Sequence, residues 1–295
     1  MISGQKILVA GASGLIGSAL IEALLPGKNE IHGVARFRDK AIQTRLEEQG
    51  VKTYAADVAT TDFAKIPGLP KKFDIVFHEL AIMLEAEVDR NYTFESNAFS
   101  VGRMIEHCAD SGVFVIASTG GVYPASDNPA KETDPLGAGG TYGASKIAME
   151  ALATFLCQQH RRPLALLRYH WPFSLTRGIV PMWAGMIARR EPIEVNTRIR
   201  SVVHPMWIGD TVRMTLAAVE KASSAPYIVN MAGDEVMERE ALIHRIAQAM
   251  GKEPAIKEGE IPFVSHVAEL TRMKADFGEV EVTLEEGIRR VVAAM

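Results

Sequence analysis

Tyr142 and Lys146 are the residues of this sequence whose types and spacing most directly suggest chemistry. They stand four positions apart in TYGASK, residues 141–146, with only small side chains between them. Alone, a tyrosine with a pKa of ~10 and a lysine with a pKa of ~10.4 exchange few protons at neutral pH. On a helix, residues i and i+4 share one face, and a nearby cation stabilises a phenolate. The spacing therefore predicts that Lys146 lowers the pKa of Tyr142, which then serves as a general acid and base.

A hydroxyl group that could assist this pair follows a short apolar run. The segment VIASTGGVYP, residues 115–124, predicts a strand end, and α/β proteins bind ligands at the carboxyl ends of their strands. Ser118 and Thr119 are the two candidates for a hydrogen bond to a substrate oxygen. The alternative is that both residues only form an ordinary turn before Gly120.

The N-terminal part of the chain contains a glycine-rich turn, GASGLIG, residues 11–17. It follows an apolar strand and opens a helix, and glycines there permit a tight turn and the close approach of a pyrophosphate. The helix directs free N–H groups and the positive end of its dipole at that anion. Gly11, Gly14 and Gly17 are therefore predicted to bind a dinucleotide rather than to serve packing alone.

The end of the second predicted strand bears on the choice of dinucleotide. An acid there usually holds the adenosine ribose hydroxyls, but this sequence has Ala35, followed by Arg36 and then Arg38. Guanidinium groups match phosphate oxygens, so the sequence favours NADP, with NAD as the alternative, unless Arg36 only stacks on adenine. Asp57, after the third strand, is expected either to accept a hydrogen bond from the adenine amino group or to form a turn.

These residues need a scaffold, and the sequence predicts one of the α/β class. Apolar strands alternate with helical patterns, which indicates a doubly wound parallel sheet of the Rossmann type, covered on both faces. Strands are expected at residues 6–10, 30–35, 51–57, 73–78, 112–118, 163–170 and 226–233. Helices are expected at residues 14–25, 41–50, 92–110, 141–159, 209–222 and 238–250, and from Thr283, an N-cap with Glu286 at the capping-box position.

In the second half of the chain the alternation becomes irregular, which indicates a second region. We expect a dinucleotide-binding domain over 1–170, to which 201–233 returns. A smaller, partly interleaved C-terminal substrate-binding region is expected over 171–200 and 234–295.

The stretch 124–140, just before the helix of Tyr142, is rich in Pro, Gly and Asp. It is expected to be a long loop. Such a loop acts either as a lid over a site or as a plain surface connector.

Composition excludes several classes of function. The chain has 32 Lys and Arg against 36 Asp and Glu, a net charge of −4, so no basic field favours nucleic acid. No apolar run reaches the ~18 residues that span a bilayer, and no targeting signal precedes the first strand, so a cytoplasmic location is expected. Cys108 and Cys157 are expected to be buried thiols, and no metal-ligand spacing is present. His78 is expected to be a packed core residue.

Together these motifs resemble the extended short-chain dehydrogenases/reductases, the NAD-dependent epimerase/dehydratase family, over the full length of the chain. The resemblance rests on GASGLIG, HELA (78–81), STGGVYP, YGASK, LRYHWP (167–172) and IGD (208–210). It implies catalytic roles for Thr119, Tyr142, Lys146 and Asn97. It implies cofactor binding by Gly11, Ser13, Gly14, Leu15, Ile16, Gly17, Arg36, Arg38, Asp57, Val58, Leu80, Ala81, Ser118, Tyr142, Lys146, Tyr169 and His170.

Departures from the family pattern limit the reaction. Family dehydratases carry Asp-Glu directly after the catalytic Ser or Thr, where this sequence has Gly120 and Gly121, so sugar dehydration is not expected. Trp171 stands where the family often has Asn, which predicts a more apolar substrate pocket. The family's arginine for a nucleotide diphosphate has no firm counterpart, which argues against a nucleotide-sugar substrate.

The sequence therefore predicts an NAD(P)-dependent oxidoreductase that transfers hydride between a nicotinamide and a secondary alcohol or carbonyl substrate. An epimerase of sugars or nucleotide sugars that uses the same site is the alternative, and a non-catalytic dinucleotide sensor is a further one. A small-molecule substrate is the expected partner. A homodimer through helices 92–110 and 141–159 is implied by the resemblance alone.

Overall fold

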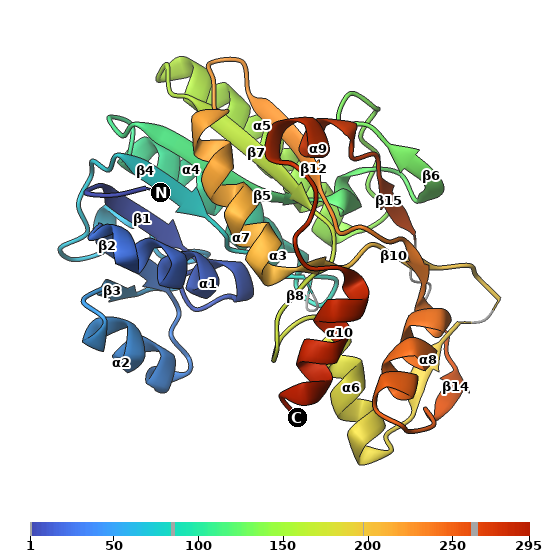
Figure 1. Ribbon diagram of the computed structural model, residues 1–295. Helices are drawn as coiled ribbons and strands as arrows, with labels where there is room; N and C mark the ends of the chain where they lie inside the picture. The colour runs from blue at the N-terminus through green and yellow to red at the C-terminus, as the bar shows by residue number, and fades with distance from the viewer. Residues whose placement is uncertain (1, 84–85, 197, 261–264) are drawn as a thin grey trace. The chain divides into compact units, whose positions relative to one another are not determined.

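The computed structural model describes residues 2–83, 86–196, 198–260 and 265–295 of the chain (Figure 1). The chain forms two compact units. The first unit comprises Met1–Val122, Leu136–Arg168 and Val212–Val229, and the second comprises Tyr123–Pro135, Tyr169–Thr211 and Asn230–Met295. Compared with the expected boundaries, 123–135 lies in the second unit, and the segment that returns to the first is shorter, 212–229.

The first unit is built on a seven-stranded sheet with the strand order β12-β7-β5-β4-β1-β2-β3. Its strands are β1 (Lys6–Ala10), β2 (Glu30–Ala35), β3 (Lys52–Ala55), β4 (Ile75–His78), β5 (Val113–Thr119), β7 (Leu164–Tyr169) and β12 (Tyr227–Met231). The pairs β1–β2, β1–β4, β2–β3 and β4–β5 are parallel. The predicted α/β class and doubly wound sheet are confirmed.

Helices lie on both faces of this sheet (Figure 1). They are α1 (Leu15–Leu24), α2 (Lys40–Glu48), α3 (Arg90–Phe94), α4 (Ser100–His107), α5 (Thr141–Gln159) and α7 (Ile208–Ala217). Neighbouring residues of a strand point to opposite faces, so Ile7 and Leu8, both fully buried, belong to different layers. Leu8 packs in one cluster with Met104 of α4 and Met149 of α5. Burial of both faces explains the near-continuous apolar runs of these strands.

One predicted helix is interrupted by a turn of π-helix. The sequence predicts a helix over 92–110, and the structure has α3, a π-helical segment over Glu95–Phe99, and then α4. Such π-segments carry one extra residue per turn and occur often at functional sites. Asn97 lies within it and is fully buried.

The second unit consists of helices and short two-stranded pairs. Its strands are β6 (Ser126–Ala130), β8 (Pro172–Phe173), β9 (Ile193–Val195), β10 (Val202–Val203), β11 (Met206–Trp207), β13 (Met237–Glu238), β14 (Ile256–Glu258) and β15 (His266–Ala268). Its helices are α6 (Ile179–Arg189), α8 (Arg239–Ala249), α9 (Thr271–Phe277) and α10 (Leu284–Ala293). An apolar core joins α6, α8 and α10 around the buried Trp183. Thr283 caps α10 as predicted, since its hydroxyl accepts the Glu286 N–H at 3.2 Å.

The expected loop over 124–140 is wrong in part. Ser126–Ala130 forms β6, which pairs with β15 in parallel. The segment SDNPA has Pro, Asp and Asn, which are depleted in strands, so local sequence gives no strand signal. The pairing also accounts for the place of 123–135 in the second unit, because β15 belongs there.

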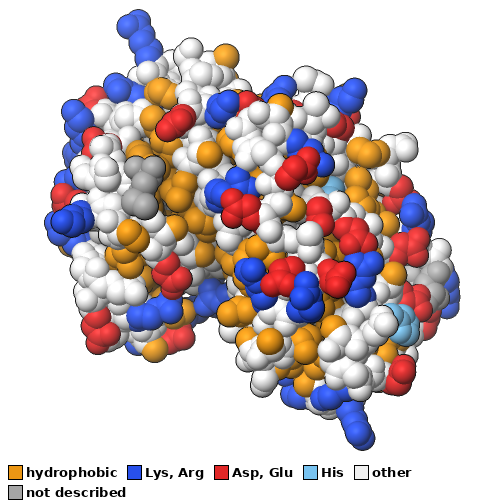
Figure 2. Space-filling model, in the orientation of Figure 1, with side chains coloured by type: hydrophobic (Ala, Val, Ile, Leu, Met, Phe, Trp, Pro, Cys, Tyr) orange, Lys and Arg blue, Asp and Glu red, His pale blue; other side chains and the backbone are white. Residues whose placement is uncertain are grey.

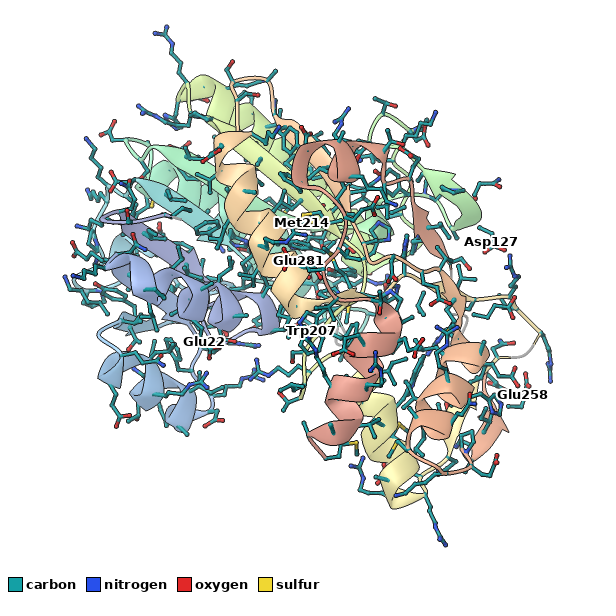
Figure 3. All side chains as sticks on the ribbon, viewed as in Figure 1. Glu22, Asp127, Trp207, Met214, Glu258 and Glu281 are labelled. Atoms are coloured by element: carbon teal, nitrogen blue, oxygen red, sulfur yellow. The ribbon has the colours of Figure 1, made fainter. Side chains whose placement is uncertain are left out.

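Charged side chains at the surface of the second unit form exposed ion pairs. Figure 3 labels two of their acidic members, Asp127 and Glu258. Asp127 pairs with Arg200 at 2.7 Å, and Glu258 pairs with Arg198 at 3.7 Å. Exposed pairs of this kind contribute little to stability, so most of the stability of the second unit comes from its apolar core.

Gly17→Ala is expected to destabilise the glycine turn, because a Cβ at this position would lie 2.2 Å from the Gly11 carbonyl oxygen. Overpacking of this kind costs about 1–3 kcal/mol, so the free energy of unfolding should fall by that amount. Urea unfolding followed by circular dichroism measures it. The matched control is Gly139→Ala, where a Cβ meets nothing within 4 Å. Equal midpoints for the two variants would contradict the argument.

Candidate active site

A pocket of about 520 Å³, including the part open to solvent, lies at the carboxyl ends of strands in the first unit. The residues that line it are Gly11, Ser13, Gly14, Ala35, Arg36, Asp57, Val58, Glu79, Leu80, Ala81, Ile82, Tyr92 and Ser96. Most of them follow β1, β2, β3 and β4, and the strand order reverses between β1 and β4. Ligands of open α/β sheets bind at such a switch point.

The glycine turn forms one wall of this pocket. Gly11 has φ of 92°, and its N–H donates to the Val34 carbonyl oxygen at 2.8 Å. A Cβ at Gly11 would lie 2.8 Å from the backbone of Glu79, so only glycine lets β1 and β4 meet there. Helix α1 begins after Gly14 and has no acidic residue in its first turn, so the positive end of its dipole is not neutralised. The wall therefore fits the pyrophosphate of a dinucleotide.

Some of the predicted cofactor residues lie outside the pocket lining. The predicted cofactor residues that are not among those that form it, in the described part of the chain, are Leu15, Ile16, Gly17, Arg38, Ser118, Tyr142, Lys146, Tyr169 and His170. Gly17 is packed against the Gly11 carbonyl, and the side chain of Arg38 is exposed.

A hydrogen-bonded group closes the pocket where β2 and β3 end. The Arg36 guanidinium donates from Nη1 to the Tyr92 hydroxyl at 3.1 Å. The same hydroxyl donates to Asp57 Oδ2 at 2.8 Å, and Asp57 Oδ1 accepts the Ala59 N–H at 3.1 Å. Asp57 thus forms the turn that was one of its two expected roles, while it also lines the pocket.

Lys146 is fully buried, and carbonyl oxygens hold its ammonium. Nζ donates to the Ala117 oxygen at 2.9 Å and to the Leu80 oxygen at 3.3 Å, so it joins the ends of β5 and β4. Burial lowers the pKa of Lys146 to about 8, although the carboxylates of Glu79 and Glu150 act against this shift. At neutral pH the ammonium remains mostly protonated.

Tyr142 and Thr119 lie together, and the pKa of Tyr142 differs in direction from the prediction. Burial raises the pKa of Tyr142, and a hydrogen bond with Thr119 acts in the opposite sense. The expectation that Lys146 lowers this pKa is therefore wrong for this structure. The largest cause is desolvation of the phenol, which disfavours its charged form. The Lys146 ammonium donates to the Ala117 and Leu80 oxygens. With its pKa raised, the Tyr142 phenol keeps its proton at neutral pH.

Asn97 connects the loop after β4 to the helix of Tyr142. Its Oδ1 accepts the Ile82 N–H at 2.7 Å, and its Nδ2 donates to the Ile82 oxygen at 2.9 Å and to Ser145 Oγ at 3.0 Å. The Ser145 hydroxyl in turn donates to the Tyr142 carbonyl oxygen at 2.7 Å. These bonds fix α5 against the loop that lines the pocket.

Ser118 points into a buried ionic group and not toward Tyr142. Its hydroxyl donates to Glu150 Oε1. Arg168 holds both oxygens of the same carboxylate, from Nε at 2.9 Å and from Nη2 at 2.7 Å. Of the two hydroxyl candidates, Thr119 is the one that the structure places beside Tyr142.

Tyr169, His170 and His78 are three further residues for which the sequence made a prediction. Tyr169 and His170 belong to the second unit, are buried, and stay predictions as cofactor contacts. His170 Nδ1 lies 3.1 Å from the His266 carbonyl oxygen. His78 is fully buried, as predicted, and burial together with the charge of Lys146 lowers its pKa to about 3.

Several pocket residues were missed by the sequence reasoning. Glu79 lines the pocket and stands directly after β4, so the rule for strand ends could have found it. Tyr92 and Ser96 come from α3 and the π-helical segment, where no local motif marks them.

The comparison with known proteins follows from this geometry. The model of the NAD dependent epimerase/dehydratase family matches residues 7–232. The chain belongs to this family. The predicted resemblance is therefore confirmed, and the chain is placed in a family of NAD-dependent enzymes.

Individual members of the family show how far the similarity extends. An uncharacterised UDP-glucose epimerase of Bacillus subtilis is 29% identical over 181 residues, which cover 56% of each chain. The chain spans about half the length of the first curated relatives that it matches. An L-arabinose 1-dehydrogenase (NAD(P)+) of Haloferax volcanii is 27% identical over 248 residues, 77% of this chain and 87% of that protein. A solved UDP-glucose 4-epimerase of Thermus thermophilus, in complex with NAD, covers 98% of both chains at 23% identity and a TM-score of 0.84, which shows the shared fold.

Among the residues that the structure describes, no group of three His, Cys, Asp or Glu side chains could hold a metal ion. No described helix has the length and apolar character to cross a membrane. Figure 2 shows Lys and Arg interspersed with Asp and Glu on the visible face. Cys108 and Cys157 are buried free thiols, and burial raises the pKa of each to about 12.

The buried Lys146 predicts a pH dependence of stability. Its pKa is 10.5 when unperturbed and about 8 in the folded chain, so between these values the unfolded chain binds more protons. Stability rises with pH in that window. The free energy of unfolding of wild type, relative to that of Lys146→Met, should therefore increase from pH 8 to 10.5. Urea unfolding at several pH values measures it, and a difference that stays constant would contradict the burial of a charged Lys146.

Proposed function

We propose that the chain is an NAD(P)-dependent oxidoreductase that interconverts a secondary alcohol and a carbonyl compound. The observation that carries the proposal is the grouping of Tyr142 with Thr119 and Lys146 in the same unit as the dinucleotide pocket. Helix α5 supplies Tyr142 and Lys146, and the end of β5 supplies Thr119. An enzyme of this class needs a proton donor and acceptor beside a dinucleotide, and these residues provide one.

The residues divide the chemistry among themselves. A nicotinamide dinucleotide, when bound, supplies or accepts the hydride. In the direction of reduction, Tyr142 gives its proton to the substrate oxygen as the C–H bond forms at the carbonyl carbon. In the direction of oxidation, the phenolate takes the proton of the substrate hydroxyl. The Thr119 hydroxyl lies beside Tyr142, where it hydrogen-bonds the phenol and can donate to the substrate oxygen. Lys146 holds α5 in place through its bonds to the Ala117 and Leu80 oxygens.

The two glycines after Thr119 argue against dehydration. A Cβ at Gly121 would lie 3.5 Å from Thr119 Oγ1 and 3.9 Å from the Tyr142 ring. A carboxylate at this position would therefore border the acid/base pair, as the family's dehydratases require. This chain has no side chain there, so no acid is available at that point for a leaving hydroxyl.

A second candidate is an epimerase that uses the same residues. It is favoured by the Bacillus subtilis relative, which is described as a UDP-glucose epimerase. An epimerase returns its hydride to the substrate, so it consumes no cofactor, whereas the proposed oxidoreductase converts one dinucleotide per turnover. The two candidates are therefore separated by whether cofactor absorbance changes during conversion of the substrate.

Tyr142→Phe is expected to lower turnover by about 10²–10⁴-fold, because the variant removes the proton donor and keeps the ring. The measurement is the loss of NADPH absorbance with a panel of carbonyl compounds, beside a fluorescence titration of NADPH binding, which should stay within about twofold. Tyr54→Phe is the matched control, since its hydroxyl bonds to His32 and the Gly68 oxygen outside the pocket. NADPH binding without turnover of any compound by wild type would favour a dinucleotide sensor.

We further propose that NADP is the preferred dinucleotide. Support comes from Ala35 in place of an acid at the end of β2 and from the Arg36 guanidinium in the pocket. The solved Thermus thermophilus epimerase is in complex with NAD, so the NADP preference is argued from the residues of this chain and not from that relative. Arg36 provides the positive charge that a 2′-phosphate requires.

Arg36→Ala is expected to weaken NADPH binding by about tenfold to a hundredfold and to leave NADH binding unchanged, because only NADPH carries the 2′-phosphate. Fluorescence titration of both cofactors measures this. Arg45→Ala is the control, since Arg45 lies on α2 and pairs at 3.3 Å with Glu22 of α1. Figure 3 labels Glu22. An equal loss for NADPH and NADH would count against a phosphate contact.

The partners proposed are a small-molecule substrate and a second copy of the chain. Helix α5 presents Phe155, whose exposed fraction is 61%, and the π-helical segment presents Phe99, with 49%. Exposed apolar rings on the two helices that the resemblance assigns to a dimer support this pairing.

A further inference from the structure

Tyr92 is a pocket residue that none of the cofactor motifs includes. It lies on α3, and its side chain reaches the pocket where β2 and β3 end. Its backbone is fixed, because Asp89 caps α3 and accepts the Tyr92 N–H at 2.9 Å. Its hydroxyl accepts from Arg36 and donates to Asp57 at the same time.

The hydroxyl of Tyr92 accepts a hydrogen bond from the cationic Arg36 and donates one to the anionic Asp57. A phenol has one proton and free lone pairs, so it serves a donor and an acceptor together. The proton goes to Asp57 Oδ2, and Oδ1 is already bound to the Ala59 N–H. Both oxygens of Asp57 are therefore engaged by the protein. A carboxylate in this state has fewer acceptor positions left for the ribose hydroxyls of NAD.

The bond to Arg36 acts on the other partner. A guanidinium has five N–H donors in one plane, and Tyr92 uses one of them at Nη1. A planar group that is held at one edge has fewer orientations to lose when its other donors bind a phosphate. Arg36 thus enters the pocket already oriented.

We propose that Tyr92 is a positioning residue that makes the pocket selective for a 2′-phosphorylated adenosine, because its hydroxyl couples Arg36 to Asp57. The inference rests on the proposed NADP preference and goes beyond it. Selectivity depends on a hydroxyl that orients the guanidinium and occupies the carboxylate, and not on the guanidinium alone.

The test uses two probes that differ only in the 2′-phosphate, adenosine 2′,5′-bisphosphate and adenosine 5′-monophosphate. Neither carries a nicotinamide, so binding measured by calorimetry is independent of turnover. Wild type should bind the bisphosphate at least tenfold more tightly. In Tyr92→Phe this ratio should fall about tenfold, with binding of the monophosphate unchanged or stronger, since a hydrogen bond to a charged group is lost. Tyr54→Phe, which removes a hydroxyl outside the pocket, should keep the wild-type ratio.

The outcomes separate this inference from the proposal on which it rests. A wild type without preference for the bisphosphate overturns the NADP proposal, and the inference with it. A wild type with the preference and a Tyr92→Phe variant that keeps it overturn only the role of Tyr92. An equal loss of both probes in Tyr92→Phe means that the residue merely supports the pocket, which also overturns it. Circular dichroism of each variant verifies that the fold is intact.

Discussion

The burial of the Lys146 ammonium is the constraint on which the site depends. An ammonium removed from water is stable only with hydrogen-bond acceptors and opposite charge around it. The carbonyls of Ala117 and Leu80 provide the acceptors, and the carboxylates of Glu79 and Glu150 provide the charge. Helix α5 must therefore lie against the ends of β4 and β5. The same placement brings Tyr142, one turn earlier on α5, beside Thr119 at the end of β5.

The ionic group around Glu150 follows from the same constraint. Glu150 lies one turn after Lys146, and a buried carboxylate needs partners of its own. Arg168 on β7 and Ser118 on β5 satisfy it. Lys146 and Glu150 thus join α5 to the ends of β4 and β5 and to β7. The stability of this region and the placement of Tyr142 beside Thr119 depend on the same set of bonds.

The sequence predicts the parts of the site that local spacing determines. The Tyr142–Lys146 pair and the glycine turn each lie within a few residues, so their geometry follows from one helix or one turn. The direction of the Tyr142 pKa shift could not be predicted, because it depends on burial by distant segments. Tyr92 was missed for the same reason, since its partners Arg36 and Asp57 lie 56 and 35 residues away.

The fold of the first unit could be predicted from the sequence better than that of the second. The parallel sheet was predictable because its strands are buried on both faces and read as apolar runs. The second unit was predicted less well. Several of its strands have only two residues, such as β10 and β11, and too short a run carries no periodicity. Strand β6 contains Pro129 and exists because β15 pairs with it.

The π-helical segment over Glu95–Phe99 determines which side of α4 faces the sheet. An α-helix turns by about 100° for each residue, so removing one residue here would rotate all of α4 by that angle about its axis. Val101, Met104 and Ile105 would then leave the apolar layer on which they now pack. Restoring them would instead displace Asn97 from Ile82 and Ser145. The extra residue lets Asn97 keep its hydrogen bonds while Val101, Met104 and Ile105 keep their apolar contacts. This short stretch should therefore tolerate substitutions far better than a change in length.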